Sequence, residues 1–524
     1  MKALKYSFII LLLAFSVSSC KDYLDVNTNP NVPQAAPAHL LLAPMFTSMG
    51  LAIQIDGQYI GKYTQYWVQS TSADNWDAHG YLASSDRGGE CWRNHYFAVG
   101  KNVDLMIDDA RARNLPAYIG LGYAIRAWGW QTIADMHGDA VIVKEAFNQD
   151  LLTFNYDSQE IAYAESNRLC DSALFYLDAK GIVDPNFAAA DQAFSGDLAK
   201  WKKFVNGVLA RNAHRLTNKA SYSADKVIAY CDAGMGTNAD NFLIPFNSTK
   251  SADGHYYGTL RDNIRGFRAS KFIVGLLNGT NATMQGAVDP RLRLMIPQNS
   301  ATDTVVAGLD PTIGLATGQL TPNLWGSTVN PASSGILGRW MFSDKAKFPI
   351  MTYSELQFIK AEAQLRKADK LGALASYKKG VDAHVDFANS FATITGNTLT
   401  TAVSAAQKTA LLANTKIVPT VADSLTMDRV MLQKYIACWG WGFLETWNDM
   451  RRFHYGLDQF KGEIVYSGFK TPETTRLFAS NGGKLAYNVR PRYNSEYIWN
   501  KASLEKLQAY DVDYHTREPW FIKP

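Results

Sequence analysis

Apolar residues recur at helical spacing over most of this chain, and this pattern restricts its fold more than any other feature. Between residues 119 and 133 they fall at steps of three and four, as Ile119, Tyr123, Ala127, Trp130 and Ile133. Such spacing places them on one face of an α-helix, which must be buried against another element. Similar stretches from about residue 38 to residue 233 predict a mostly α-helical protein built from antiparallel helix pairs.

Further helices are predicted at several places. Apolar spacing marks residues 161–177 and 201–213, and Asp197 is the predicted N-cap of the second of these helices. A helix is also predicted from about Met427 to Phe453. The segment 354–377 resembles a tetratricopeptide unit, in which small residues such as Ala361, Ala363, Gly372 and Ala375 let two helices pack closely.

The N-terminus predicts an exported, lipid-anchored protein. Residues 1–19 contain two lysines, the apolar run Phe8–Phe15 and then small residues, which is the layout of a secretory signal peptide. Val17-Ser18-Ser19-Cys20 matches the site that a bacterial lipoprotein signal peptidase cleaves before the cysteine receives lipid. We therefore predict that Cys20 carries acyl chains, with an ordinary signal peptide or an uncleaved anchor as alternatives. Multiple acylation holds a protein at a bilayer without a spanning helix.

Composition divides the rest of the chain. Residues 20–37 are polar and rich in Asn and Pro, which predicts an extended tether. Residues 38–524 are predicted to form one helical domain, and its segment 234–349, rich in Gly, Asn, Thr, Ser and Pro, is predicted to be a loop-rich insertion.

Several function classes lack sequence support. The net charge is only +4, and no dense Lys/Arg block lies beyond the leader, so nucleic-acid binding is not predicted. Zinc-protease, nucleophile-elbow and phosphate-loop motifs are missing. A glycosidase needs only two well-placed carboxylates, so missing motifs do not exclude one. The four cysteines after Cys20 form no Cys-x-x-Cys pair, and most are predicted to be small buried residues: Cys91, Cys170, Cys231 and Cys438.

Charged residues in the predicted helices are interpreted as architectural. Among Glu445, Asp449, Arg451 and Arg452, several pairs lie two to four residues apart, and ion pairs within and between helices form readily in such a group. The tripeptide Asp289-Pro290-Arg291 is interpreted as a turn with a salt bridge.

Aromatic residues in polar loops give the candidate ligand site. Sugar rings have apolar faces, so carbohydrate sites combine an exposed Trp or Tyr with side chains that bind hydroxyl groups. Two loop segments have this character, although a loop tryptophan can also pack down onto the core. The predicted stacking residues are Trp76, Tyr81 and Trp325, with Asn75, Asp77 and Asn323 as hydrogen-bonding neighbours. Tryptophans in helical pattern are instead predicted to be core residues: Trp128, Trp130, Trp201, Trp439 and Trp441.

Short motifs occur in a characteristic order along nearly the whole chain, at Cys20–Asn31, Asp135–Ala140, Glu145–Phe147, Gly196–Arg211, Asp289–Arg291, Met351–Ala363, Glu445–Arg452 and Arg490–Tyr493. Each segment is weakly specific alone, but their order and spacing together resemble the SusD/RagB family of outer-membrane nutrient-binding lipoproteins, in particular its SusD-like branch. The Gly138-Asp139 motif departs from the family by continuing as Ala140-Val141-Ile142 rather than proline and an aromatic residue.

The resemblance implies a single α-helical SusD-like domain with tetratricopeptide-like helix pairs and a looped, ligand-facing side. It also implies a protein anchored through Cys20 in the outer membrane, facing the cell exterior. Its expected partners are a SusC-like TonB-dependent β-barrel transporter and an oligosaccharide ligand, with no enzymatic activity and no cofactor beyond the lipid. Alternatives are a peptide-binding lid of a peptide importer, a surface glycoside hydrolase, or a lid without a ligand of its own. The identity of the ligand and the presence of a metal such as calcium stay open.

Overall fold

The computed structural model describes residues 36–69, 74–148, 150–297, 308–312, 322–326, 339–392, 402–456 and 459–524. The predicted signal peptide, Cys20 and the tether up to residue 35 lie outside these residues. Helices dominate the described part, whose strands form three antiparallel two-stranded pairs, β1–β3, β2–β4 and β5–β6. The predicted mostly α-helical class is therefore confirmed.

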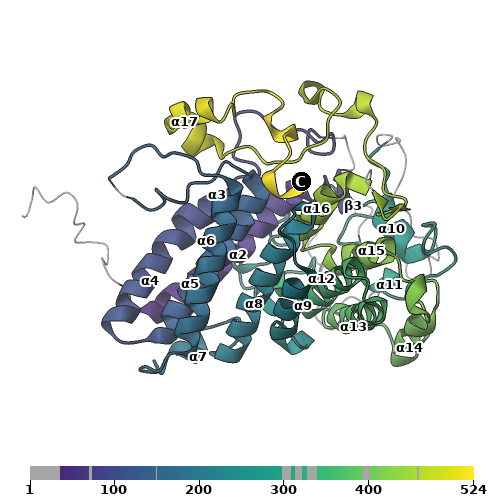
Figure 1. The fold of residues 1–524 in the computed structure, drawn as a ribbon, viewed down its shortest axis with the longest axis horizontal. Helices are drawn as coiled ribbons and strands as arrows, with labels where there is room; N and C mark the ends of the chain where they lie inside the picture. Colours follow the sequence, from purple (N-terminus) through teal and green to yellow (C-terminus); the bar gives the residue numbers. More distant parts are fainter. Residues whose placement is uncertain are drawn as a thin grey trace, which may run out of the picture.

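A row of helices packed side by side forms the scaffold (Figure 1). Helix α5 packs on α4 and α6, α6 packs on α8, and α8 continues the row to α9 and α12. The predicted helices around residues 119–133, 161–177 and 201–213 are confirmed, and Asp197 caps α8 by accepting hydrogen bonds from the amides of Ala199 and Lys200. The helices of the row are α4 (Gly100–Ala112), α5 (Pro116–His137), α6 (Gln159–Asp178), α8 (Leu198–Arg215), α9 (Ala224–Ala233) and α12 (Tyr353–Arg366).

The pair that resembles a tetratricopeptide unit is α12 with α13 (Lys370–Asn389). Side chains at both helix starts serve as N-caps, Thr352 for α12 and Asp369 for α13. Gly380 of α13 lies against the ring of Phe358, where a Cβ atom would come within 2.9 Å of that ring. A small residue is therefore needed for the close approach of the two helices.

The predicted helix over residues 427–453 is wrong in one respect, because it is divided into α15 (Met427–Cys438) and α16 (Phe443–Arg452). Gly440 has a φ of +89°, which breaks the helical path between them. The preceding Trp439 leaves the helix to stack on Trp340, with ring centroids 5.3 Å apart. Tertiary packing thus overrides a continuous helical pattern.

Buried ion pairs join the helices across the core, so the architectural interpretation of these charges is confirmed. Arg215 of α8 lies 3.0 Å from Asp135 of α5 and 2.5 Å from Glu445 of α16. Arg452 pairs with Asp449 one turn earlier at 2.6 Å and with Glu362 of α12 at 2.8 Å. The predicted Asp289–Arg291 salt bridge is also present, at 2.6 Å.

Helix α2 (Ala38–Ile60) begins the described domain and is the one described helix long and apolar enough to cross a membrane. Half of the relevant window is buried inside the protein, where α2 packs against α3 (Glu90–Arg93) and α4. It also buries the polar side chains of Gln54 and Asp56. These contacts identify α2 as a core helix. The four cysteines beyond Cys20 are buried and free of disulfide bonds, as predicted for most of them.

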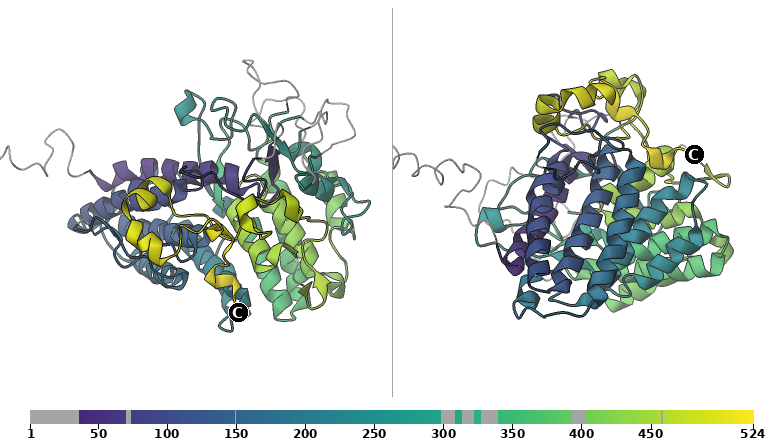
Figure 2. Two further views of the ribbon diagram at one scale, coloured as in Figure 1. Left: turned by 90° about the horizontal axis from the view of Figure 1, so that it is seen from above. Right: turned by 60° about the vertical axis from the view of Figure 1, so that its left-hand side comes forward.

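Two irregular regions cover the scaffold. In the described residues of the segment 234–349, the longest helix is α10 (Lys271–Asn278) and the strands are short: β2 (Phe242–Ile244), β3 (Phe267–Ala269) and β4 (Phe348–Met351). The C-terminal segment, which contains α17 (Lys501–Lys506), crosses one end of the helices α3 to α6 (Figures 1 and 2). This crossing brings the end of the chain back to loops of the N-terminal part.

Candidate functional site

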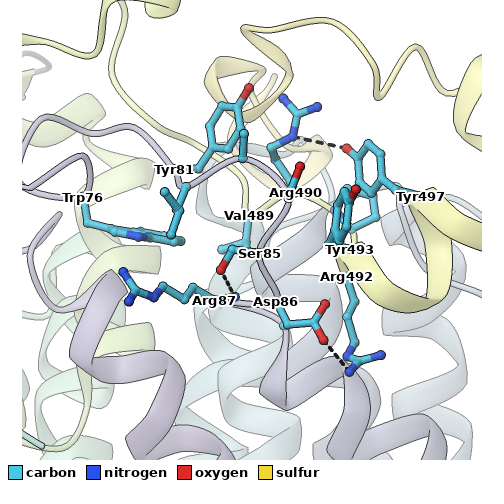
Figure 3. Close-up of a pocket in the computed structure, with 15 residues that line it drawn as sticks. Trp76, Tyr81, Ser85, Asp86, Arg87, Val489, Arg490, Arg492, Tyr493 and Tyr497 are labelled. Atoms are coloured by element: carbon cyan, nitrogen blue, oxygen red, sulfur yellow. Dashed lines mark hydrogen bonds and ion pairs between the residues drawn. The ribbon is translucent and has the colours of Figure 1, made fainter.

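A cleft of about 190 Å³ lies where the loop 81–89 meets the segment 489–497 (Figure 3). We call it the tyrosine cleft, because three half-buried tyrosines line it together with charged side chains. Its residues are Trp76, Tyr81, Leu82, Ala83, Ser84, Ser85, Asp86, Arg87, Gly89, Val489, Arg490, Pro491, Arg492, Tyr493 and Tyr497.

Backbone contacts hold the two walls of the cleft in place. The Phe478 amide donates a hydrogen bond to the carbonyl of Ala78 at 2.8 Å, and the Val489 amide donates to the carbonyl of Met136 at 2.7 Å. The side-chain amide of Asn75 donates to the carbonyl of Tyr81 at 2.9 Å. The C-terminal segment is therefore tied both to the loop and to the end of α5.

The aromatic part of the cleft is built around Arg490. Its guanidinium lies 4.4 Å from the ring centroid of Tyr81 and 5.5 Å from that of Tyr497. Tyr493 stacks on Tyr497 with centroids 5.7 Å apart and an angle of 19° between the rings. Figure 3 shows these side chains pointing toward the same space. They supply aromatic surface and hydroxyl groups beside a cation, which suits the mixed apolar and polar surface of a sugar.

The charged part of the cleft centres on Asp86. Its carboxylate accepts a hydrogen bond from Arg492 at 2.5 Å, and from the backbone and side-chain amides of Asn494 at 2.8 and 2.6 Å. Among the described residues that line the cleft, Asp86 is the only acidic one. The exposed Arg87 lies over the ring of Tyr59 at 5.2 Å. The cleft thus offers several donors and one already engaged carboxylate.

Trp76 lies at the floor of the cleft and is only 2% exposed. Its indole packs against Tyr59 and Tyr63, with centroid distances of 5.3 and 5.5 Å. The prediction that Trp76 stacks on a ligand through an exposed face is therefore wrong. Trp76 is buried and supports the cleft from below. Tyr81, in contrast, is half-buried and presents its ring to the cleft, so it stays a candidate ligand residue.

Asn75 and Asp77 hold the loop rather than face the cleft. Asp77 is buried, accepts a hydrogen bond from the Asp74 amide at 3.0 Å and lies 3.8 Å from the Lys62 ammonium. Burial raises the pKa of Asp77 to about 7, against the opposing attraction of Lys62. The side-chain amide of Asn75 donates its hydrogen bond to the Tyr81 carbonyl. The prediction that these two side chains bind ligand hydroxyl groups is not supported by this geometry.

Trp325 and Asn323 do not belong to the tyrosine cleft. Trp325 is 2% exposed, and its indole N–H donates to the carbonyl of Tyr257 at 2.7 Å. Asn323 is also buried and accepts a hydrogen bond from the Trp325 amide at 3.0 Å. The prediction of an exposed platform at Trp325 is wrong, because burying a large indole is favourable wherever its N–H finds an acceptor. The five tryptophans expected in the core are all buried, as predicted.

Four important cleft residues were missing from the predicted site: Arg490, Arg492, Tyr493 and Tyr497. The sequence does show an aromatic and basic segment here, part of which contributes to the family resemblance. This segment follows the loop 81–89 by about 400 residues in the sequence. A local sequence pattern therefore cannot show that the two lie together in space. The density of Arg and Tyr in an irregular segment was the available signal.

One buried group has the composition of a metal site. His214, Glu362 and Asp449 hold potential ligand atoms within 4.8 Å of one another. However, Arg452 binds both carboxylates, and the Lys434 ammonium lies 2.7 Å from Asp449. Burial lowers the pKa of His214 to about 4, so its ring is neutral at pH 7. Cationic side chains already neutralise these carboxylates, which makes the cluster part of the ion-pair network rather than a vacant metal site.

Comparison with known proteins identifies the family. The sequence model of the family SusD-like_2, described as "Starch-binding associating with outer membrane", matches residues 30–463. None of the curated proteins matches the chain.

Solved structures share the fold over nearly their whole length. A SusD/RagB family protein from Bacteroides thetaiotaomicron is 22% identical, with a TM-score of 0.67 over 93% of this chain and 99% of that one. A SusD homologue from Bacteroides fragilis is 17% identical, with a TM-score of 0.69 over 93% and 100%. A chitin-binding SusD homologue from Flavobacterium johnsoniae is 19% identical, with a TM-score of 0.65 over 93% and 99%. These TM-scores establish a shared fold, and the family match over residues 30–463 shows that the chain belongs to the SusD/RagB family.

Proposed function

We propose that this protein is a cell-surface binding protein that captures a glycan in the tyrosine cleft and delivers it to an outer-membrane transporter. The observation that carries this proposal is the grouping of Tyr81, Tyr493 and Tyr497 around Arg490, next to the Asp86–Arg492 pair. Rings of this kind pack on the C–H faces of sugars, and the charged groups bind hydroxyl groups. The starch-binding description of the family and the chitin-binding relative support a carbohydrate ligand.

Binding without hydrolysis fits the acidic residues of the cleft. Most glycoside hydrolases need two carboxyl groups on either side of the scissile bond. The described lining of the tyrosine cleft contributes one carboxyl group, that of Asp86, and Arg492 and Asn494 already engage it. We therefore favour capture over cleavage.

The binding test uses soluble protein that begins after Cys20. Calorimetric titration with starch, chitin and other plant and microbial oligosaccharides, beside a set of peptides, is expected to give saturable binding of one glycan class without cleavage products. Tyr493→Ala is expected to weaken that binding at least about tenfold, because a stacking contact is lost. Tyr230→Ala, which removes a half-buried tyrosine from the distant helix α9, is the matched control. Cleavage products would establish an enzyme, and binding of peptides alone would establish a peptide importer component.

The anchor and the transporter partner are tested in cells of the native host. The Cys20→Ser variant of the full-length chain is expected to leave the outer-membrane fraction, because it lacks the acyl chains that hold the protein at the bilayer. Affinity purification of the wild-type protein from detergent-solubilised membranes is expected to recover a TonB-dependent β-barrel transporter. Unchanged membrane retention of the serine variant would refute lipid anchoring at this residue.

A further inference from the structure

A second cavity of about 480 Å³ lies beside the tyrosine cleft and contains none of the predicted site residues. We call it the aromatic pocket, because five aromatic side chains line it: Trp92, Tyr96, Phe97, Phe147 and Phe154. Its volume falls in the range of about 300–1,000 Å³ that is usual for small-molecule sites. It is also well above the ~150 Å³ of an engineered cavity that binds benzene. A substituted aromatic ring therefore has room inside it.

The two cavities share a wall. Arg492 lines both cavities, and Asp86, its ion-pair partner, lines the tyrosine cleft. The π-helix η10 (Tyr493–Tyr497) presents Tyr493 and Tyr497 to the cleft, whereas its residues Ser495 and Glu496 line the aromatic pocket. The two cavities are therefore direct neighbours on either side of Arg492.

Both cavities involve the rare π-helical conformation. In the described part of the chain, π-helix occurs at η10 and at η2 (Asn94–Val99), and η2 supplies Tyr96 and Phe97 of the aromatic pocket. Single π-helical turns are uncommon and are frequent at functional sites. Their presence on two sides of one pocket is independent support for a binding role.

Unsatisfied polar and exposed apolar groups indicate the kind of ligand. At the junction, the buried Nε of Arg492 and the buried Oγ of Ser495 have no hydrogen-bond partner among the described residues. Buried polar atoms are normally paired, so a ligand oxygen at this junction would satisfy them. At the rim, the side chain of Phe97 is 69% exposed, and an aromatic ligand would cover it.

We infer that the aromatic pocket binds an aryl group attached to the sugar that occupies the tyrosine cleft. The oxygen that joins the aryl group to the sugar, or an ester carbonyl next to it, lies at the junction and accepts hydrogen bonds from Arg492 and Ser495. This inference rests on the proposed glycan-binding function and specifies its ligand as an aryl-substituted saccharide.

The test compares paired probes that differ only in the aryl group. These are the methyl and 4-nitrophenyl glycosides of maltose, cellobiose and N,N′-diacetylchitobiose, with methyl ferulate as an aryl probe without sugar. The 4-nitrophenyl glycoside is expected to bind at least about tenfold more tightly than its methyl counterpart, because the ring leaves water for the aromatic pocket. Methyl ferulate is expected to bind weakly without any sugar.

Two variants assign this preference to the aromatic pocket. Ala146→Phe places a ring in the pocket and is expected to abolish the aryl preference and methyl ferulate binding, while affinity for the methyl glycoside stays unchanged. Phe97→Ala is expected to reduce the preference about threefold or more, as hydrophobic contact at the rim is lost. Phe175→Ala, which removes a 70% exposed ring on the distant helix α6, is its matched control. Retained methyl glycoside binding and melting temperature show that the variants fold.

The outcomes separate this inference from the proposed function. Equal affinities for methyl and aryl glycosides would overturn the aryl site and leave glycan binding intact. Binding of methyl ferulate, sensitive to Ala146→Phe, without binding of any glycoside would support an aryl site and refute glycan capture by the cleft. Tight binding of N-acetylphenylalanine amide, with the same sensitivity and no aryl glycoside preference, would assign the pocket to a peptide side chain and overturn the inference.

Discussion

Arg492 and Asp86 lie 406 residues apart in the sequence, yet the Arg492 guanidinium donates a hydrogen bond to the Asp86 carboxylate at 2.5 Å. This pair closes one wall of the tyrosine cleft and stands between it and the aromatic pocket. Because both side chains are partly exposed, the pair contributes little to stability, about 0–1 kcal/mol. With the hydrogen bonds from Asn494 to Asp86, it joins the loop 81–89 to the segment that carries Tyr493 and Tyr497.

The first prediction concerns this pair. Asp86→Ala and Arg492→Met are each expected to lower affinity for the bound glycan about tenfold, and the double variant is expected to lose less than the sum of the two, because both changes break the same ion pair. Calorimetry of the four proteins measures this coupling. Arg517→Met, which breaks the exposed pair with Asp511 elsewhere in the C-terminal segment, should leave affinity unchanged. Additive losses in the double variant would show that the two residues act independently.

The second prediction separates buried from exposed tryptophans. Trp325→Ala is expected to lower the free energy of unfolding by about 3–5 kcal/mol, because it empties a core site. Trp499→Ala, which removes a 72% exposed side chain, should change it by less than about 0.5 kcal/mol. Urea unfolding compares the two variants. A Trp325→Ala protein of unchanged stability that has lost glycan binding would show that Trp325 is a sugar platform and not a core residue.

The third prediction concerns the buried ion network. Glu445→Ala is expected to destabilise the protein by about 3–5 kcal/mol, because it leaves Arg211 and Arg215 buried with fewer counter-charges. Lys367→Ala breaks an exposed pair with Asp225 and should leave the stability nearly unchanged. Thermal and urea unfolding measure both variants. Equal costs would mean that the buried network does not hold the helices together.

The fourth prediction is a loss of stability in mild acid. Burial lowers the pKa of His79 to about 3 and that of His515 to about 4, whereas both rings titrate near 6.5 in an unfolded chain. Between pH 6.5 and pH 4 the unfolded state therefore binds more protons, and the free energy of unfolding falls as the pH falls. A histidine whose pKa drops from 6.5 to about 4 accounts for roughly 3 kcal/mol of this loss.

Urea unfolding at pH 7.5 and pH 5 tests whether the free energy of unfolding falls as the pH falls. The His515→Gln variant should lose less stability on acidification than the wild-type protein, because it no longer gains a proton on unfolding. The matched control is His454→Gln, which changes a half-buried histidine in the short helix η7 (His454–Gly456) that follows α16. Identical pH dependence of the His515→Gln and wild-type proteins would contradict the assignment.

Local pattern in the sequence was sufficient for the scaffold of this protein. Spacing of apolar residues predicted α5, α6, α8 and the α12–α13 pair, because a helix buries every third or fourth side chain and this periodicity is visible along the chain. The N-cap at Asp197 and the buried tryptophans of the helices followed from the same local rules. The order of short motifs was sufficient to indicate the family, which the comparisons show.

Tertiary structure alone decided the site. Whether the loop indoles of Trp76 and Trp325 face water or the core depends on acceptors and rings supplied by distant segments. The break at Gly440 depends on the packing of Trp439 against Trp340. The tyrosine cleft itself exists because the C-terminal segment returns to the loop 81–89. Such long-range contacts are set by how the finished helices pack, and residue spacing along the chain carries no direct record of them.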